Sequence, residues 1–278
     1  MSTVGRIVRK SQTSLFWCMR GLPKSKREAI YTLFAFIRHI DSIIESALPE
    51  AEKIDLLEAW KIEFSNIYDK KVPETKIGRK IYKNCMRFKI KKEDFVPILD
   101  AALLDFPTPL QAPETKTFEK YCNGTAIMPL YITLAIMGDF KEAAMRTLAH
   151  NFGMAIELTI ILRNIKDDAL KGHLYIPREL LKDAQINATD PMTVVTDKNL
   201  TSVREKLGLE AHRCFVKTYK MISASNKKNM RPLKFIFHIY KRYFDIMFLR
   251  GWEIMSPKPQ IGRRDKLAIV LKTIFDCI

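Results

Sequence analysis

Residues 33–44 read LFAFIRHIDSII, and residues 153–172 read GMAIELTIILRNIKDDALKG. Both stretches place apolar side chains three and four residues apart, which is the spacing of a helix with a buried face. The same spacing runs through most of the chain, and the alternating patterns typical of strands are rare. We therefore predict an all-α fold. No linker is polar enough to divide the chain, so residues 1–278 are expected to form a single domain.

Prolines punctuate this helical pattern. Pro23 stands where a helix can begin, and Pro49, Pro73 and the prolines of 107–113 fall at helix breaks. The pattern predicts helices over residues 24–46, 50–69, 76–88, 92–104, 115–136, 140–168, 199–225, 230–250 and 263–276. Residues 169–198 are predicted to be a turn-rich connection.

The composition excludes several classes of protein. Of the 278 residues 47% are hydrophobic and 28% charged, which is too apolar for a disordered chain. The sequence contains no GxGxxG or GxxxxGK motif, so a Gly-rich phosphate loop is excluded. The five cysteines are far apart and form no CxxC motif, so neither a zinc site nor a disulfide framework is expected. No segment resembles a signal peptide or a spanning helix, which predicts a cytoplasmic protein.

The chain is strongly basic, with 47 Lys and Arg against 31 Asp and Glu. Residues 212–278 alone carry a net charge of +11 out of the total of +16. Nucleic acid, an anionic membrane or a phosphorylated substrate could explain this excess, and so could a simple solvated surface. No nucleic-acid-binding module is recognisable, so no nucleic-acid partner is expected. Basic residues interleaved with aromatic and aliphatic ones after residue 230 predict peripheral contact with the inner face of an anionic membrane.

Polar residues form a line along the first of the two quoted helices. Phe34, Arg38, Asp41 and Glu45 follow one another at steps of four, three and four, so they share one helix face. Asp41 and Glu45 could hold a divalent cation through their carboxylate oxygens. The alternative is a structural ion network in which Arg38 pairs with these carboxylates.

The second helix repeats the theme. Glu157, Ile160, Asn164 and Asp168 share one face, and Arg163 lies beside it. Two apolar helices that each end in acidic residues indicate a metal–diphosphate site. In such a site Mg²⁺ bridges protein carboxylates and substrate phosphates, and basic side chains bind the leaving group.

Three segments resemble the squalene/phytoene synthase family in their order and separation. Residues 14–46 (SLFWCMRGLPKSKREAIYTLFAFIRHIDSIIES) look like the N-terminal signature of that family. Residues 121–126 (YCNGTA) look like its Tyr-Cys element, and residues 157–180 (ELTIILRNIKDDALKGHLYIPREL) look like its second acidic motif. Residues 250–267 (RGWEIMSPKPQIGRRDKL) are similar to the C-terminal segment of the bacterial branch that makes presqualene diphosphate in the hopanoid pathway.

The resemblance implies a helical bundle of the isoprenoid synthase type around a central apolar cavity. It implies head-to-head condensation of two farnesyl or geranylgeranyl diphosphates through a cyclopropyl intermediate, with Mg²⁺-assisted loss of diphosphate. It implies catalytic roles for Asp41, Glu45, Asp168, Arg38, Arg163 and Tyr175, substrate contacts for Ser14, Phe16, Phe34, Tyr121, Thr125, Glu157 and Asn164, and metal coordination by Asp41, Glu45, Asn164 and Asp168. Mg²⁺ is the implied cofactor, and no motif decides whether NADPH is used.

The sequence also departs from the family pattern. Ser42 replaces an acid after Asp41, Ile160 replaces a ligand, and neutral Asn164 replaces a carboxylate. Other family positions are changed at Ile127, Leu130 and His173, the first two of which are expected to narrow the tail cavity. The histidines form no ligand spacing and are interpreted as structural.

Two functions therefore stay open, and the retained acidic and basic residues favour the first. One is a head-to-head prenyltransferase with an unusual site. The alternative is a catalytically inactive relative that acts as an assembly or binding factor. The family includes such a branch, a mitochondrial factor for respiratory complex I, so a respiratory-complex client would be the partner in that case.

Overall fold

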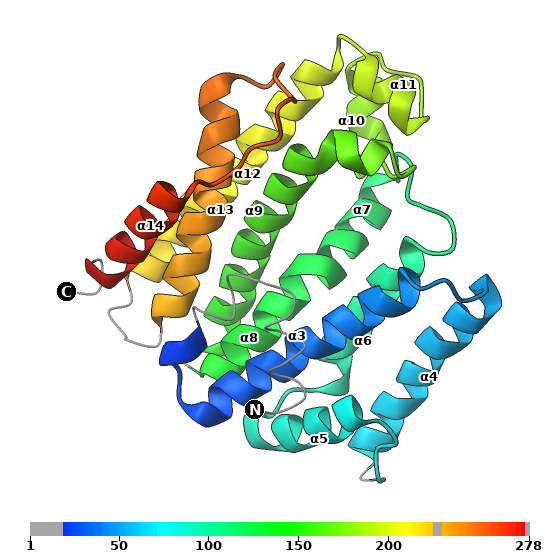
Figure 1. Cartoon of the computed structure of the whole chain (residues 1–278), viewed down its shortest axis with the longest axis vertical. Helices are drawn as coiled ribbons and strands as arrows, with labels where there is room; N and C mark the ends of the chain where they lie inside the picture. The colour runs from blue at the N-terminus through cyan, green and yellow to red at the C-terminus, as the bar shows by residue number, and fades with distance from the viewer. Residues whose placement is uncertain (1–18, 70, 139, 225–229, 276–278) are drawn as a thin grey trace.

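The computed structural model describes residues 19–69, 71–138, 140–224 and 230–275, and these residues form helices and no strand (Figure 1). In chain order the elements are the 3₁₀ helix η1 (Met19–Gly21), α3 (Lys24–Ile44), α4 (Glu50–Tyr68), α5 (Lys76–Phe88), α6 (Lys92–Leu104), α7 (Thr115–Cys122), the π-helical segment η2 (Asn123–Ile127), α8 (Met128–Met137), α9 (Glu142–Ala169), α10 (Arg178–Asp183), α11 (Pro191–Thr196), α12 (Leu200–Ser223), α13 (Arg231–Arg250) and α14 (Arg263–Phe275).

The predicted all-α class is confirmed, and most helix ends lie within two residues of the prediction. Two predictions need correction. The single helix expected over residues 115–136 is divided into α7, η2 and α8, because the backbone of residues 123–127 takes a π-helical turn. The connection expected over residues 169–198 contains the short helices α10 and α11.

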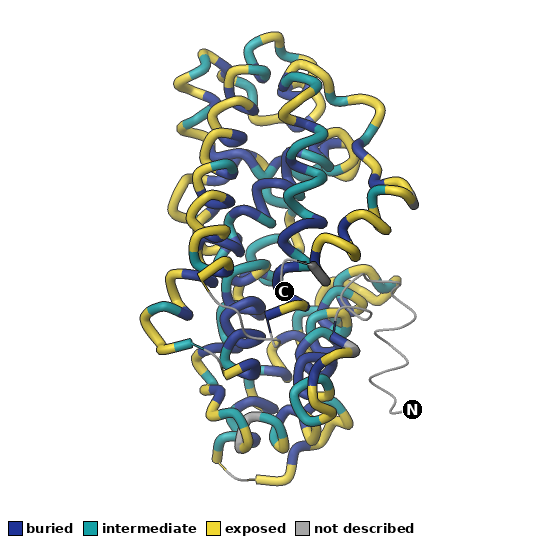
Figure 2. Tube along the Cα trace, turned by 90° about the vertical axis from the view of Figure 1, so that its left-hand side faces the viewer, coloured by how far each residue is buried: buried dark blue, intermediate teal, exposed yellow. Residues whose placement is uncertain are grey.

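The 28-residue helix α9 runs through the middle of the bundle (Figure 1). It packs against α12 along much of its length and also contacts α8, α13 and η2. Residues 151–162 of α9 are buried or half-buried on all sides, which explains why this part is largely apolar, whereas residues 142–150 expose one polar face. Figure 2 shows the same division, with buried segments inside the bundle and exposed segments along its outer surface.

A buried aromatic cluster fixes α3 against α4 and α6. The ring of Phe36 on α3 lies 4.9 Å from that of Trp60 and 5.3 Å from that of Phe64, both on α4. Phe64 in turn stacks on Phe95 of α6 at 4.8 Å. Edge-to-face and offset contacts of this kind add to the hydrophobic gain from burying the rings. The cluster holds α3 in place one turn before Asp41.

The segment η2 is held closely between α6 and α9. A Cβ atom at Gly124 would lie 2.0 Å from the carbonyl oxygen of Pro97 and 2.4 Å from the Cβ of Ala101, both on α6. On the other side, a Cβ at Gly153 of α9 would lie 2.8 Å from the Cα of Ile127. Only glycine permits these close approaches of backbone to backbone.

Two loops that are far apart in the sequence are joined by backbone hydrogen bonds. Leu174 donates its N–H to the carbonyl of Leu110 at 2.7 Å and accepts from the N–H of Ala112 at 3.0 Å. The side chain of Gln111 donates to the carbonyl of Gly172 at 3.0 Å. These bonds bring the end of α6 next to the turn that follows α9. Within the described ranges, no helix has the length and apolar character needed to cross a membrane.

Candidate active site

A cavity of about 300 Å³ lies between α3, α6, α7 and η2, next to the turn after α9. Its apolar lining comes from Ile37, Ile40, Ile44, Ile98, Ala101 and Ala102. Its polar lining comes from Asp41, Asp105, Tyr121, Thr125 and His173. The cavity therefore has an aliphatic part, supplied by α3 and α6, and a part that carries carboxylate, phenol and imidazole groups. Among its lining residues none belongs to α9, and the predicted narrowing residues Ile127 and Leu130 are also absent from the lining.

The α3 side of the cavity carries an ion pair. Arg38 Nη1 lies 3.0 Å from Asp41 Oδ2, so the ion pair considered as an alternative for this helix is formed. Burial raises the pKa of Asp41, while the charge of Arg38 lowers it and that of Glu45 raises it. Glu45 is exposed, and Phe34 packs at the edge of the core. Because both partners are more than a third exposed, the pair adds less than about 1 kcal/mol to stability.

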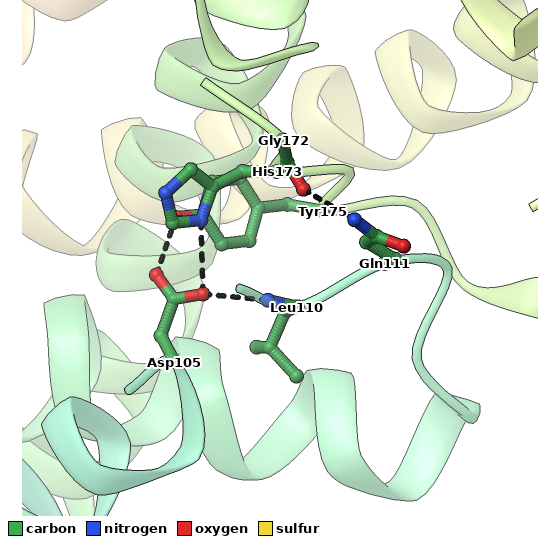
Figure 3. Close-up of polar contacts among 6 residues, drawn as sticks. All are labelled: Asp105, Leu110, Gln111, Gly172, His173 and Tyr175. Carbon is green, nitrogen blue, oxygen red and sulfur yellow. Dashed lines mark hydrogen bonds and ion pairs between the residues drawn. The ribbon is translucent and has the colours of Figure 1, made fainter. Parts of the chain in front are cut away.

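The α6 side carries a polar cluster that the motifs did not predict (Figure 3). Asp105 Oδ2 accepts a hydrogen bond from the hydroxyl of Tyr175 at 2.5 Å. Asp105 Oδ1 accepts from the backbone N–H of Leu110 at 2.8 Å and lies 3.0 Å from Nδ1 of His173. The Tyr175 oxygen is also 2.9 Å from the same Nδ1. One carboxylate thus contacts two side chains and the backbone of one loop.

Aromatic stacking completes this cluster. The ring of Tyr175 stacks on Tyr121 at 4.7 Å and on His173 at 5.4 Å, with interplanar angles of 14° and 23°. Burial, followed by nearby carboxylates, raises the pKa of both phenols far above the ordinary value of a tyrosine. Tyr121 and Tyr175 therefore keep their protons at neutral pH and serve as donors and as aromatic faces.

The carboxylates of α9 lie outside the cavity lining. Glu157 is buried, and burial raises its pKa to about 7, although the hydroxyl of Thr125 favours the charged form. Burial also raises the pKa of Asp168 to about 6, against the opposing charges of His173 and Lys171. The charge of Glu157 contributes to the raised pKa of Tyr121, and the charge of Asp168 contributes to that of Tyr175.

Arg163, for which the family resemblance implies a catalytic role, lies against α13 and residues 251–262. Its Nε donates to the carbonyl of Pro259 at 3.0 Å, and its guanidinium lies over the ring of Tyr243 at 4.5 Å. Its Nη1 donates to the side-chain oxygen of Asn164 at 3.2 Å, so that predicted metal ligand is already engaged. The guanidinium of Arg163 thus has a backbone, a side-chain and an aromatic partner.

The predicted metal ligands come from two separate helices. Within the described residues, no group of three or more His, Cys, Asp or Glu side chains is arranged to hold a metal ion. Asp41 lies on α3 and Glu45 is the C-cap residue of that helix, whereas Asp168 and Asn164 lie on α9. Single carboxylates on separate helices suit Mg²⁺ only when a further oxygen donor such as a diphosphate completes its shell.

Residues 251–262 cross the end of α9, which the motifs did not predict. Lys258 Nζ lies 2.6 Å from Asp167 Oδ2, and Lys166 Nζ donates to Ser256 Oγ at 3.2 Å. Lys258 is one of the basic residues after residue 230, and it pairs with an acid of the second acidic motif. The predicted substrate contacts Ser14 and Phe16 lie outside the described residues.

Sequence reasoning missed Asp105 and interpreted His173 as structural. Asp105 directly follows the predicted helix over residues 92–104 and has no acidic neighbour at helical spacing. Its partners His173 and Tyr175 are 68 and 70 residues away. The usable signal was the replacement of a family arginine at His173, because a changed residue beside the Tyr-x-Pro element points to a changed partner.

Comparison with known proteins identifies the family to which the chain belongs. Residues 8–264 match the model of the squalene/phytoene synthase family. Presqualene diphosphate synthase of Rhodopseudomonas palustris is 30% identical over 261 residues, which covers 94% of this chain and 92% of that protein. Presqualene diphosphate synthase of Sinorhizobium fredii is 29% identical over 260 residues, with the same coverage.

The fold agrees with these sequence matches. A crystal structure of a dehydrosqualene synthase in complex with ligand superposes with a TM-score of 0.82 at 20% identity, covering 98% of this chain and 94% of that one. The fold is thus the all-α bundle of the isoprenoid synthases. With the family model matched over nearly the whole sequence, the chain belongs to the squalene/phytoene synthase family.

Proposed function

We propose that this protein is a prenyltransferase that condenses two prenyl diphosphates head to head, with farnesyl or geranylgeranyl diphosphate as substrate. The observation that carries this proposal is the cavity of about 300 Å³, which joins an aliphatic wall to a wall of carboxylates and aromatic rings. An apolar prenyl chain fits the aliphatic wall, and its diphosphate would meet the carboxylate wall only through Mg²⁺, because carboxylates and diphosphate repel each other. The family and its presqualene diphosphate synthase members support the same reaction.

The chain's own residues can divide the work as follows. The isoleucines of α3 and α6 hold the prenyl chain and exclude water from the reacting carbon. Arg38 at the cavity and Lys258 beside the second acidic motif offer positive charge to diphosphate oxygens. Asp41 and Asp168 present oxygen donors from two helices, and Mg²⁺ bound with the diphosphate would supply charge neutralisation to the leaving group.

The reaction begins with loss of diphosphate from one substrate. The bond between C1 and oxygen breaks, its electron pair leaves with the diphosphate, and an allylic cation remains. The double bond of the second substrate supplies the electrons of the new carbon–carbon bond, and closing the cyclopropane ring releases one proton. The product retains one diphosphate, as in presqualene diphosphate.

A direct assay tests this proposal. Purified protein is incubated with Mg²⁺ and either farnesyl or geranylgeranyl diphosphate, and both inorganic diphosphate and the prenyl product are measured, the latter by mass spectrometry. We expect one diphosphate released for each two substrates consumed. Hydrolysis to a free prenyl alcohol, or no consumption of either substrate, would contradict the proposal. Adding NADPH to a parallel reaction shows whether the product is reduced further.

A second candidate function is an inactive assembly or binding factor with a protein client such as a respiratory complex. It is favoured by the engagement of Asn164 with Arg163 and by the lack of a gathered metal centre in the described part of the chain. In this case the assay above would release no diphosphate, while the protein would still bind a prenyl diphosphate or its client.

We also propose that the protein is cytoplasmic and peripheral to the inner face of an anionic membrane. Helix α14 exposes Leu267, Val270 and Leu271, with relative exposures of 61%, 39% and 45%. Arg264, Lys266 and Lys272 are exposed on the same helix. Apolar side chains set among cations suit shallow insertion into an anionic lipid surface.

A further inference from the structure

Asp105 is a carboxylate at the cavity whose hydrogen bonds are already made. Its two oxygens receive the hydroxyl of Tyr175, the N–H of Leu110 and the imidazole nitrogen of His173. Its side chain is 17% exposed, and it belongs to the cavity lining. A carboxylate with this many partners is fixed in one orientation before any ligand enters.

Asp105 differs from Asp41, the other cavity carboxylate, in the partner that neutralises its charge. Asp41 is paired with the guanidinium of Arg38 at 3.0 Å. Within the described residues the only ion-pairing partner of Asp105 is His173, and that contact is ionic only when the imidazole is protonated. No arginine or lysine of this part of the chain neutralises Asp105, so its negative charge can act on the contents of the cavity.

The hydrogen bonds and rings around Asp105 suit a carboxylate that stabilises a cation without forming a covalent bond to it. Both oxygens are occupied by donors, which reduces their tendency to form a covalent bond with an electrophilic carbon. Tyr121 and His173 line the same cavity, and each of their rings stacks on the ring of Tyr175. Aromatic faces therefore accompany the carboxylate. The negative face of an aromatic ring also attracts a cation.

We propose that Asp105 is the counter-charge for the allylic cation in this cavity and thereby a catalytic residue. The inference rests on the proposed function, because that cation forms only when diphosphate leaves a prenyl substrate. Heterolysis at C1 sends the electron pair away with the diphosphate, and the positive charge spreads over the allylic carbons. Asp105 forms no bond and exchanges no proton in this step. It lowers the energy of the developing positive charge relative to the neutral carbon that precedes it.

The joined loops give this charge its fixed position. Leu110 follows Asp105 by five residues and donates to it, and the same loop is bonded through Leu110 and Ala112 to Leu174. Leu174 lies between His173 and Tyr175 in the sequence. Its backbone hydrogen bonds to Leu110 and Ala112 therefore position all three hydrogen-bond partners of Asp105 together. Little reorganisation is then needed when the cation forms, which is the condition for strong electrostatic stabilisation.

The first experiment measures the charge without any turnover. Farnesylamine, whose ammonium nitrogen is attached to C1 and so carries a positive charge next to the reacting carbon, and neutral farnesol are titrated into the wild type and into Asp105→Asn. We expect wild type to prefer the amine, and Asp105→Asn to lose this preference by about tenfold or more, since removing a unit charge several ångströms away has that size. Farnesol affinity serves as the internal measure of a folded cavity.

Two further variants separate charge from shape. Asp100→Asn removes an exposed carboxylate from the same helix and should leave the preference for the amine unchanged. Tyr175→Phe removes one donor but keeps the charge of Asp105, so it should retain most of the preference. If Tyr175→Phe lost the preference as fully as Asp105→Asn, the hydrogen-bond network and not the charge would carry the effect, and the proposal would be wrong.

The second experiment uses turnover of farnesyl diphosphate. Asp105→Asn should lower kcat by about 100-fold or more while KM changes little, because the interaction strengthens only in the transition state. An active wild type whose Asp105→Asn variant keeps its kcat and its preference for the amine would overturn the role of Asp105 alone. A wild type that consumes no prenyl diphosphate would instead overturn the proposed function, while the amine titration still reports the charge.

Discussion

At the scale of single residues, the burial of Glu157 should make the free energy of unfolding depend on pH. Its pKa is raised by burial from the ordinary 4.5 to about 7. Between those pH values the unfolded carboxyl ionises first, so the free energy of unfolding should fall as pH rises and stay level above about 7. Relative to Glu157→Gln, the wild type should lose about 3 kcal/mol over this window. Urea unfolding at pH 4.5, 6 and 8 measures it, and parallel pH profiles for the two proteins would contradict it.

Asp41 and Asp168 lead to a prediction about activity. Each presents carboxylate oxygens on a different helix, and a Mg²⁺–diphosphate pair would need both. Asp41→Asn and Asp168→Asn should therefore each reduce diphosphate release by about 100-fold or more. Isothermal titration should also show Mg²⁺ binding in the presence of diphosphate and none in its absence. Asp55→Asn on the exposed face of α4 is the control, and unchanged turnover in both site variants would exclude this assignment.

At the scale of elements, the contact between η2 and α6 depends on one missing side chain. Gly124→Ala would place a Cβ 2.0 Å from the carbonyl oxygen of Pro97, so η2 must move and the cavity beside it must change. We expect the free energy of unfolding to fall by about 1–3 kcal/mol or more. Gly21→Ala is the matched control, because nothing lies within 4 Å of its added Cβ. Equal denaturation midpoints for the two variants would show that η2 can move away from α6 without loss of stability, which would contradict the prediction.

The attachment of residues 251–262 to α9 gives a prediction about Arg163. Arg163→Met removes the hydrogen bond to Pro259 and the contact with Tyr243, and should lower the free energy of unfolding by about 1–3 kcal/mol. Limited proteolysis should then cut within 251–262 more rapidly than in the wild type. Arg163→Lys keeps the charge and should be intermediate. Full stability combined with lost activity would instead favour the catalytic role that the family resemblance implies.

How far the sequence predicted these elements depends on how local the responsible contacts are. The ends of α3, α5 and α6 followed from prolines and from three-and-four spacing, which are local signals. The π-turn of η2 has no comparable signature, because α8 beyond it is buried at nearly every position, so a rotation of the helix there leaves no break in the apolar pattern. Asp105 meets His173 and Tyr175 only through a bridge between loops, and no spacing along the chain encodes that meeting.

At the scale of the whole molecule, the excess of positive charge leads to a prediction about lipid. The protein should bind anionic vesicles in a salt-sensitive way, and Arg264→Gln, Lys266→Gln and Lys272→Gln together should weaken partitioning on the order of 100-fold, at about 1 kcal/mol for each charge. These substitutions are cleaner than truncation after Trp252, which would also remove the contacts of Arg163 and Asp167.

The matched control for this vesicle experiment removes the same charge from another helix. Lys206→Gln, Lys217→Gln and Lys220→Gln together alter the exposed side of α12 and should preserve more of the binding. Equal losses from the two triple variants would mean that net charge and not α14 directs the protein to lipid. Equal binding to neutral and anionic vesicles would leave the basic excess as solvated surface.

The π-turn in η2 also rotates α8 about the helix axis relative to α7, although the two helices would otherwise form one continuous helix. Each residue of an α-helix advances by about 100° around the axis, so one additional residue in a turn rotates everything beyond it by that angle. Tyr121 lies before this turn and the fully core-facing α8 lies after it. Deleting one residue between 123 and 127 would restore a continuous α-helix and turn Tyr121 out of phase with α8. One additional residue in η2 therefore lets the chain bury α8 in the core and at the same time place the ring of Tyr121 at the cavity.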